Sequence, residues 1–338
     1  MTEPTIALLY GRVDPGAPDD EKDVLVQVET VRAALASLGR RTIDVPVTLD
    51  LGAAADALSA AAPVVAFNLA ETIEGKGSLI HLVPSLLESL GIPFTGAPCE
   101  AILLTSHKLL AKKTLAAEGI PTPRWKTAAD ARTGGLAFPP SWIVKSVWEH
   151  ASIGLEDSAV VRGAAELAAE IRRRTVREPV EHLFVEEYID GREFNLALLG
   201  GAGSAPPQSL PPAEIRFVGW PRGKPRVVGY RAKWVDGSPE YAGTPRGFDF
   251  PEEDAPLLAE LVRLSRECWR IFSLRGYARV DFRVDGSGRP WVLEINTNPC
   301  LSPDAGFMAA AGKAGLTIDE VVRRIVADAA IAKAACTD

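Results

Sequence analysis

The first hundred residues alternate short apolar runs with stretches of helical periodicity. Three runs have the length and composition of buried strands, at residues 5–10, 42–45 and 64–69. After the first run, apolar residues recur every three or four positions, as in a helix that packs one face on a sheet; they are Leu25, Val28, Val31, Leu35 and Leu38. Strands that alternate with helices form parallel sheets, which bind ligands at the carboxyl ends of their strands. The pattern predicts an N-terminal α/β unit.

A second region begins where Gly119 ends a helix that starts near Ser106 and the sequence IPTP follows. The pattern predicts strands at residues 141–146 and 182–189, with a polar loop and a helix at 164–174 between them. Further strands are predicted at 194–199 and 213–217, followed by a long helix at 252–272, a hairpin and a terminal helix. The order of these elements predicts a chain of mixed α/β and α+β class.

The predicted hairpin places polar side chains on one face of two strands. Apolar residues alternate with polar ones along both strands, and DGSGRP between them is turn chemistry. The alternation assigns the apolar face to Ala278, Val280, Phe282, Trp291, Leu293 and Ile295. If Val284 pairs with Trp291, Asp281 lies opposite Glu294, and Arg279 lies opposite Asn296.

Two carboxylates that face each other across a sheet, about 5 Å apart, repel unless a cation lies between them. Mg²⁺ prefers such oxygen ligands, and Asp281, Glu294 and Asn296 supply two carboxylates and an amide. The alternative is the solvated polar face of an amphipathic hairpin. The pattern of the hairpin alone leaves both interpretations open.

Composition narrows the class of protein. The chain has 338 residues, which predicts two or three domains, and its net charge of −7 argues against nucleic acid as a partner. Neither a signal peptide nor a run long enough to cross a bilayer is expected, so the predicted location is the cytoplasm. The cysteines form no CxxC pair, which argues against a zinc site or a disulfide framework; they are Cys99, Cys268, Cys300 and Cys336.

Nucleotide binding has no standard loop motif in this chain. There is no GxxxxGK[ST], and the glycines that begin at Gly200 lack the GxGxxG spacing. Lys108 and Lys145 are candidates for phosphate contacts, because a lysine provides a point charge. Taken singly, each is more simply a surface lysine, although Lys145 lies within an apolar strand.

The order of several segments resembles the D-alanine:D-alanine ligases of the ATP-grasp superfamily. The similar segments are LLYG, GIPFTG, SHKLLAKKTLAAEGIPTP, WIVKSVWEHASIG, FVEEYIDGREFNLALLG, RAKW, RVDFRV and LEINTNP. The resemblance implies an ATP-grasp fold with an N-terminal parallel-sheet α/β domain. It implies an N-terminal domain at residues 1–104, a central ATP-grasp subdomain at 105–190 and a C-terminal subdomain with the metal hairpin at 191–338.

The same resemblance implies roles for individual residues. Arg279 would stabilise the oxyanion, and two Mg²⁺ ions would bind Asp281, Glu294 and Asn296. Glu186 would meet the adenine amino group and Glu193 the ribose hydroxyls. The remaining ATP contacts would come from Lys108, Lys145, Ser152, Glu187, Tyr188, Ile189 and Lys233.

The substrate site departs from the family pattern at several positions. Ala151 stands where the family's flap has a serine, Trp234 where it has a tyrosine, and Cys300 where it has a glycine. The family's glutamate after the first strand becomes an acidic stretch, in which Asp20, Glu21 or Asp23 is a candidate for a substrate ammonium or an acidic first helical turn. Glu71 and Glu74 are candidate contacts for a cationic substrate. Cys300 is a reactive thiol or, more simply, a structural cysteine.

These residues predict an ATP-dependent carboxylate–amine ligase that acts through an acyl phosphate, on amino acids or small peptides other than two D-alanines. An ATP-binding protein without ligase activity and a ligase that modifies a protein are the alternatives. The expected partners are a small-molecule carboxylate and amine, with neither nucleic acid nor membrane. The resemblance also implies a homodimer.

Overall fold

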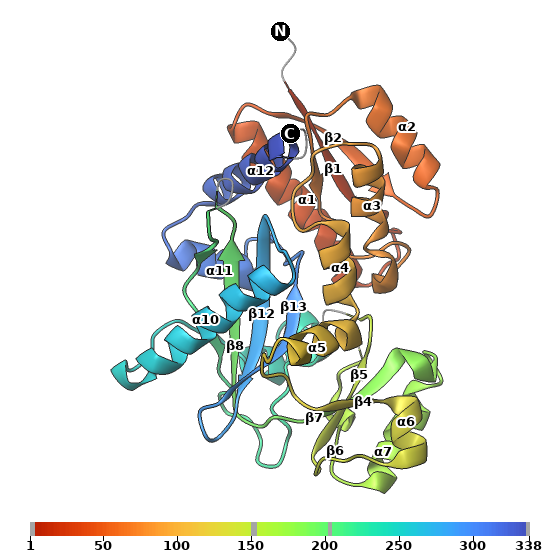
Figure 1. Ribbon diagram of the computed structural model, residues 1–338, viewed down its shortest axis with the longest axis vertical. Helices are drawn as coiled ribbons and strands as arrows, with labels where there is room; N and C mark the ends of the chain where they lie inside the picture. Colours follow the sequence, from red (N-terminus) through yellow and green to blue (C-terminus); the bar gives the residue numbers. More distant parts are fainter. Residues whose placement is uncertain (1–3, 150–153, 202–204, 336–338) are drawn as a thin grey trace.

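The N-terminal part is a parallel three-stranded sheet with helices on both faces (Figure 1). The computed structural model describes residues 4–149, 154–201 and 205–335. The strand order is β2-β1-β3, and both pairs are parallel, which confirms the predicted α/β unit. Its elements are β1 (Thr5–Gly11), α1 (Asp19–Ser37), β2 (Arg41–Val47), α2 (Leu51–Ala61), β3 (Val65–Asn68) and α3 (Leu82–Ser89). None of the helices in the described residues is long and apolar enough to span a membrane.

The middle of the chain forms an antiparallel sheet, β4-β7-β5-β6, with helices beside it. Two consecutive helices, α4 (Cys99–Ser106) and α5 (Lys108–Ala117), lead to this sheet. The sheet and its helices are β4 (Trp125–Thr127), α6 (Ala128–Gly134), β5 (Trp142–Ser146), β6 (Val160–Val161), α7 (Ala164–Arg174) and β7 (Leu183–Glu187). The chain passes from β7 directly into the next sheet.

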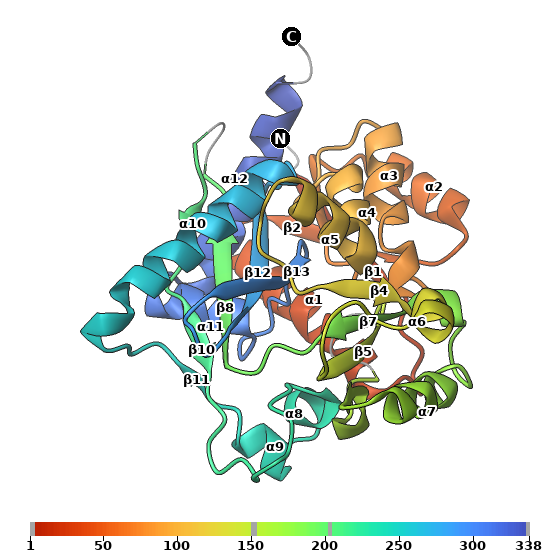
Figure 2. The ribbon, with the colours of Figure 1, turned by 60° about the horizontal axis from the view of Figure 1, so that its bottom comes forward.

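The last part contains a sheet of order β11-β10-β8-β12-β13, with β9 paired to β8. Helix α10 (Ala255–Ile271) packs on this sheet, while α8 (Tyr230–Trp234) and α9 (Pro239–Ala242) lie beyond its lower end in Figure 2. Helix α11 (Gly306–Lys313) leads to α12 (Ile318–Ala335), which returns to pack on α1. The strands are β8 (Arg192–Leu199), β9 (Gln208–Ser209), β10 (Ala213–Ile215), β11 (Arg246–Gly247), β12 (Tyr277–Val284) and β13 (Pro290–Asn296).

The hairpin β12–β13 has the predicted pairs at its functional end and a bulge nearer its turn. Asp281 pairs with Glu294, and Arg279 pairs with Asn296, as the alternation predicts. The assumed pair of Val284 with Trp291 is wrong, because the register shifts between Asp281 and Phe282 and places Val284 opposite Pro290. A bulge leaves one residue of a strand unpaired, so the strand's alternation changes there.

The bulge also corrects the predicted apolar face of β13. Val292, which is fully buried, packs in the core with Ile295 and Phe282. Trp291 and Leu293 are only half-buried, and the Trp291 indole donates to Asp285 Oδ2 at 2.9 Å. Because of this extra residue, the side chains of β13 before Glu294 lie on the opposite faces from those that alternation predicts. Glu294 itself still pairs with Asp281.

Candidate active site

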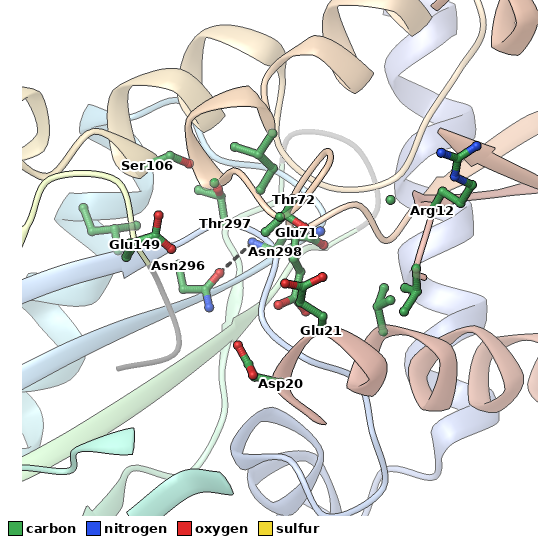
Figure 3. Close-up of a pocket in the computed structure, with 17 residues that line it drawn as sticks. Arg12, Asp20, Glu21, Glu71, Thr72, Ser106, Glu149, Asn296, Thr297 and Asn298 are labelled. Atoms are coloured by element: carbon green, nitrogen blue, oxygen red, sulfur yellow. Dashed lines mark hydrogen bonds between the residues drawn. The ribbon is translucent and has the colours of Figure 1, made fainter. Parts of the chain in front are cut away.

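A cavity lies where α1, the loops after β1 and β3, and the end of β13 meet (Figure 3). Carboxylates from α1 and from the loop after β3 line it, namely Asp20, Glu21 and Glu71, and Asn296 lines it from β13. Gly11 permits this meeting, because a Cβ there would lie 2.2 Å from the Thr72 carbonyl oxygen. Glu149, after β5, also lines the cavity, so the fold brings together acidic residues that are up to 129 positions apart in the sequence, beside the end of the β12–β13 hairpin.

The two carboxylates of the hairpin are both held by cations of the chain. Arg279 donates from Nε to Asp281 Oδ1 at 2.7 Å and from Nη2 to Oδ2 at 2.8 Å, and Asn195 Nδ2 donates to Oδ1 at 2.8 Å. Lys108 Nζ lies 3.6 Å from Glu294 Oε2. Burial alone would lower the pKa of Arg279, but the negative charge of Asp281 outweighs burial and raises that pKa. Arg279 and Lys108 therefore offset part of the repulsion expected between Asp281 and Glu294.

The donor set of the hairpin fits a hard divalent cation. Asp281, Glu294 and Asn296 all offer oxygen, and Asn298 N donates to Asn296 Oδ1 at 2.9 Å, which fixes that amide. The described residues contain no group of three or more His, Cys, Asp and Glu side chains arranged for a metal. These side chains therefore form no metal cage of their own in the part of the chain that the structure describes.

The three predicted phosphate lysines lie close to the hairpin or to the sheet beside it. Lys108 Nζ donates to the Glu149 carbonyl oxygen at 2.6 Å, and burial lowers the pKa of Lys108 although Glu294 opposes that shift. Lys233 lies on α8, where burial and then the charge of Arg279 lower its pKa. Lys145 on β5 pairs with Glu186. The carboxylates of Glu294, Asp281 and Glu193 act in the opposite direction on the pKa of Lys233.

Glu186, the predicted adenine contact, is enclosed between two lysines. Its side chain is 1% exposed and forms ion pairs with Lys145 and with Lys112, whose side chain is also 1% exposed. Lys112 Nζ also donates to Thr122 Oγ1 at 2.8 Å. Burial alone would raise the pKa of Glu186, but the two lysines hold it below its usual value. Burial lowers the pKa of Lys112 to about 8.

Lys112 is a site residue that the sequence interpretation missed. It follows Lys108 by four positions, which places both lysines on one face of α5. This spacing of four was the signal in the sequence from which a role for Lys112 beside Lys108 could have been predicted. The pattern does not show that the partner of Lys112 is a carboxylate 74 positions later.

Replacing Lys112 by Met is expected to destabilise the protein by about 3 kcal/mol, because a buried carboxylate then loses one of its two cations. Lys113, the exposed neighbour, provides the matched control, and Lys113→Met should change stability by less than about 0.5 kcal/mol. Urea unfolding measures both. The double variant Lys112→Met with Glu186→Gln should regain most of the loss, and a double variant as unstable as the single one would contradict the pairing.

The remaining predicted nucleotide residues lie at the junction of the two antiparallel sheets. Arg283 Nη2 pairs with Glu193 at 2.8 Å, and burial raises the Glu193 pKa against that cation. The Glu187 carboxylate accepts from Arg124 at 2.7 and 2.8 Å, and Ile189 is buried. The Tyr188 hydroxyl accepts from the Arg226 backbone nitrogen at 2.9 Å. Ser152, like Ala151, lies outside the described residues.

The predicted substrate residues divide into those that face the cavity and those held by other side chains. Asp23 accepts from Cys300 Sγ and from Ser302 Oγ, each at 3.0 Å, which ties α1 to the loop after β13. Burial raises the pKa of the Cys300 thiol, which favours its protonated form over the reactive thiolate. Asp20 accepts from the Tyr230 hydroxyl at 2.9 Å and still lines the cavity.

Trp234, the last residue of α8, is half-buried, and neither it nor Cys300 lines the cavity formed by the described residues. Glu74 is exposed. Glu71 lines the cavity and accepts from Gln27 Nε2 at 2.7 Å. Burial, above all, raises the pKa of Glu71 to about 7. Among the predicted substrate residues, Asp20, Glu21 and Glu71 therefore remain the ones that face the cavity.

Comparison with known proteins assigns the family. A family model described as D-ala D-ala ligase C-terminus matches residues 117–327. A D-alanine–D-alanine ligase of Moorella thermoacetica is 30% identical over 325 residues, covering 92% of this chain and 96% of that protein. An uncharacterized protein of Sinorhizobium fredii, y4sG, is 32% identical over 307 residues, covering 88% of this chain and 85% of that one.

Among solved structures, the D-alanine–D-alanine ligase of Bacillus anthracis complexed with ATP matches with a TM-score of 0.72 at 21% identity, covering 98% of this chain and 99% of that one. The fold is thus the ATP-grasp fold of these ligases, which confirms the predicted fold class. The chain belongs to the D-alanine–D-alanine ligase family.

Proposed function

We propose that the protein is an ATP-dependent ligase that activates a carboxylate as an acyl phosphate and joins it to an amine. The observation that supports this most is the pairing of Asp281 with Glu294 beside Arg279, at one end of a cavity lined by further carboxylates. Metal-binding oxygens and a fixed guanidinium at one place suit phosphoryl transfer followed by attack at a carbonyl.

ATP would bind between the two antiparallel sheets. Glu186 would accept from the adenine amino group, Glu193 would bind the ribose, and Lys108, Lys145 and Lys233 would contact phosphates. Glu187, Tyr188 and Ile189 would border the purine, with Ser152 in the flap. The related Bacillus anthracis enzyme was solved with ATP, which supports a nucleotide site in this fold. Lys145 must then exchange its partner Glu186 for a phosphate.

Asp281, Glu294 and Asn296 would hold Mg²⁺, two ions by the family resemblance. When bound, Mg²⁺ would neutralise the charge of the transferring phosphoryl group. A substrate carboxylate attacks the γ-phosphorus of ATP, and ADP leaves. An amine nitrogen then attacks the activated carbonyl, Arg279 donates to the negative oxygen of the tetrahedral intermediate, and phosphate leaves.

The cavity favours substrates with ammonium groups. Asp20, Glu21 and Glu71 supply negative charge there, as amino acids or small peptides require. Trp234 and Cys300 differ from the family pattern, and Ala151 removes a hydroxyl from the flap. A site that loses hydrogen-bonding groups rejects the substrate that used them more strongly than a changed apolar wall does. We therefore propose a substrate pair other than two D-alanines.

Incubation with ATP, Mg²⁺, hydroxylamine and single amino acids or dipeptides is expected to give a hydroxamate with at least one acid. Hydroxylamine traps an acyl phosphate without a second substrate, so the assay isolates activation from ligation. Millimolar D-alanine alone should yield little D-alanyl-D-alanine. Efficient synthesis of that dipeptide would refute the proposed specificity, and no hydroxamate across a broad panel would refute ligation itself.

A further inference from the structure

Glu71 differs from Asp20 and Asp23, two carboxylates of the neighbouring helix α1, in how its side chain is held. One carboxylate oxygen, Oε1, accepts from Gln27 Nε2 at 2.7 Å. Gln27 is 2% exposed, and its own Oε1 accepts from Leu301 N at 3.1 Å, so the donor is itself fixed. Asp23, in contrast, accepts from Cys300 and Ser302, and Asp20 accepts from Tyr230. Among the described residues, one neutral donor thus orients Glu71 at the cavity.

The charges around Glu71 leave it able to gain and lose a proton. None of the described lysines or arginines forms an ion pair with it, although Arg279 and Lys233 lie near enough to favour its ionised form. Burial and Asp23 act in the opposite direction, and the pKa of Glu71 is about 7. The titratable groups coupled to it by charge are Asp23 on α1, Tyr277 and Arg279 on β12, Lys233 on α8 and Cys300 after β13. The other charged residues that line the same cavity are Arg12, Asp20, Glu21 and Glu149.

The ligation step needs such a group. An ordinary amine is protonated at neutral pH, and its nitrogen has no lone pair with which to attack a carbonyl. A carboxylate whose proton affinity matches the working pH is a suitable general base, and general base catalysis contributes about 10²- to 10⁴-fold. Glu71 lines the same cavity as Asn296, the residue that pairs with Arg279, the proposed oxyanion donor.

We propose that Glu71 accepts the proton of the amine substrate's ammonium group before the nitrogen attacks the acyl phosphate. This rests on the proposed ligase function. The N–H bond breaks and the proton passes to the Glu71 carboxylate. The freed lone pair forms the C–N bond, and the C–O bond to the phosphoryl group breaks, so that phosphate leaves with that electron pair. The nitrogen loses its second proton to the departing phosphate, and Glu71 returns its proton to solvent.

Two acceptors of nearly equal size test this role in Glu71→Gln. Hydroxylamine is neutral at neutral pH, whereas methylamine is protonated. The acid that gives most hydroxamate is supplied at saturating concentration, so that weaker binding of its ammonium group does not limit the rate. Glu71→Gln should then form hydroxamate within about twofold of the unmodified protein, but methylamide about 10²-fold more slowly. Retained hydroxamate formation also shows that the variant is folded. Glu100→Gln, an exposed carboxylate on α4, is the matched control and should leave both products unchanged.

The pH dependence gives a second readout. The unmodified protein should lose methylamide formation as pH falls through about 7, where Glu71 becomes protonated. The Glu71→Gln rate should instead rise about tenfold for each pH unit, because only solution deprotonates methylamine. Equal slowing with both acceptors, or no slowing with either, would overturn the proposal for Glu71 alone. Absence of hydroxamate from the unmodified protein would overturn the ligase function and, with it, this proposal.

Discussion

Replacing Glu294 by Gln, or Asp281 by Asn, is expected to lower Mg²⁺-dependent turnover by about a thousandfold. Both variants remove an oxygen charge from the proposed metal site, and metal stabilisation of a transferring phosphoryl group contributes several kcal/mol, about 1.4 kcal/mol for each factor of ten. The fold should survive, because each amide keeps the size of the carboxylate that it replaces and one oxygen that can still accept a hydrogen bond. Initial rates at increasing Mg²⁺ concentration and urea unfolding measure the two effects.

The exposed Glu252, at the start of the short helix before α10, provides the matched control. Glu252→Gln should have normal turnover at every Mg²⁺ concentration. Removal of Mg²⁺ with a chelator should abolish turnover of the unmodified protein, and added Mg²⁺ should restore it. Full activity in both hairpin variants would show that these side chains hold no essential metal and that their pairing is structural.

Arg279→Met should slow amide formation by about 10²- to 10³-fold, because the intermediate then lacks a preorganised oxyanion donor. Arg279→Lys should slow amide formation less than Arg279→Met does, because it keeps the positive charge. Some slowing should remain, because lysine lacks the two parallel N–H donors that hold Asp281. Rapid quenching after one turnover separates acyl phosphate and ADP from the final amide. The acyl phosphate should accumulate in Arg279→Met.

A fall in ADP formation as large as the fall in amide formation would contradict this assignment. It would mean that Arg279 acts first through Asp281, whose carboxylate it holds with two hydrogen bonds. Arg289→Met is the control on the same hairpin, since the exposed Arg289 lies in its turn and stacks on Trp291. It should leave both steps unchanged.

The hairpin shows how far alternation of polar and apolar residues can predict a site. Alternation placed Asp281 opposite Glu294 although it began from a wrong pair. It predicted these partners because the strands are regular from Asp281 to their functional end. It did not predict the bulge, because a bulge depends on how Val292 and Trp291 pack against other elements, and the local pattern does not contain that information.

The acidic residues near the cavity show what a local pattern cannot predict. Local pattern alone does not rank Asp20, Glu21, Asp23 and Glu71 as substrate contacts, since each is a carboxylate after a predicted strand or in a helical first turn. The structure separates them by their partners. Asp23 accepts hydrogen bonds from Cys300 and Ser302, about 280 positions away, whereas within the described part of the chain Glu71 accepts from Gln27. Contacts at such separations depend on the packing of α1 against the loop after β13.

The sequence by itself determined the order of strands and helices, the parallel N-terminal sheet and the types of residue that carry the chemistry, because periodicity and side-chain character are local properties. Tertiary structure decided which of the charged side chains pair with one another. It enclosed Glu186 between Lys112 and Lys145, and it paired Asp281 with Arg279. Glu71 has no ion pair among the described residues. The physical reason is burial: removing a charge from water makes its few remaining neighbours decide its protonation, and those neighbours are distant in sequence.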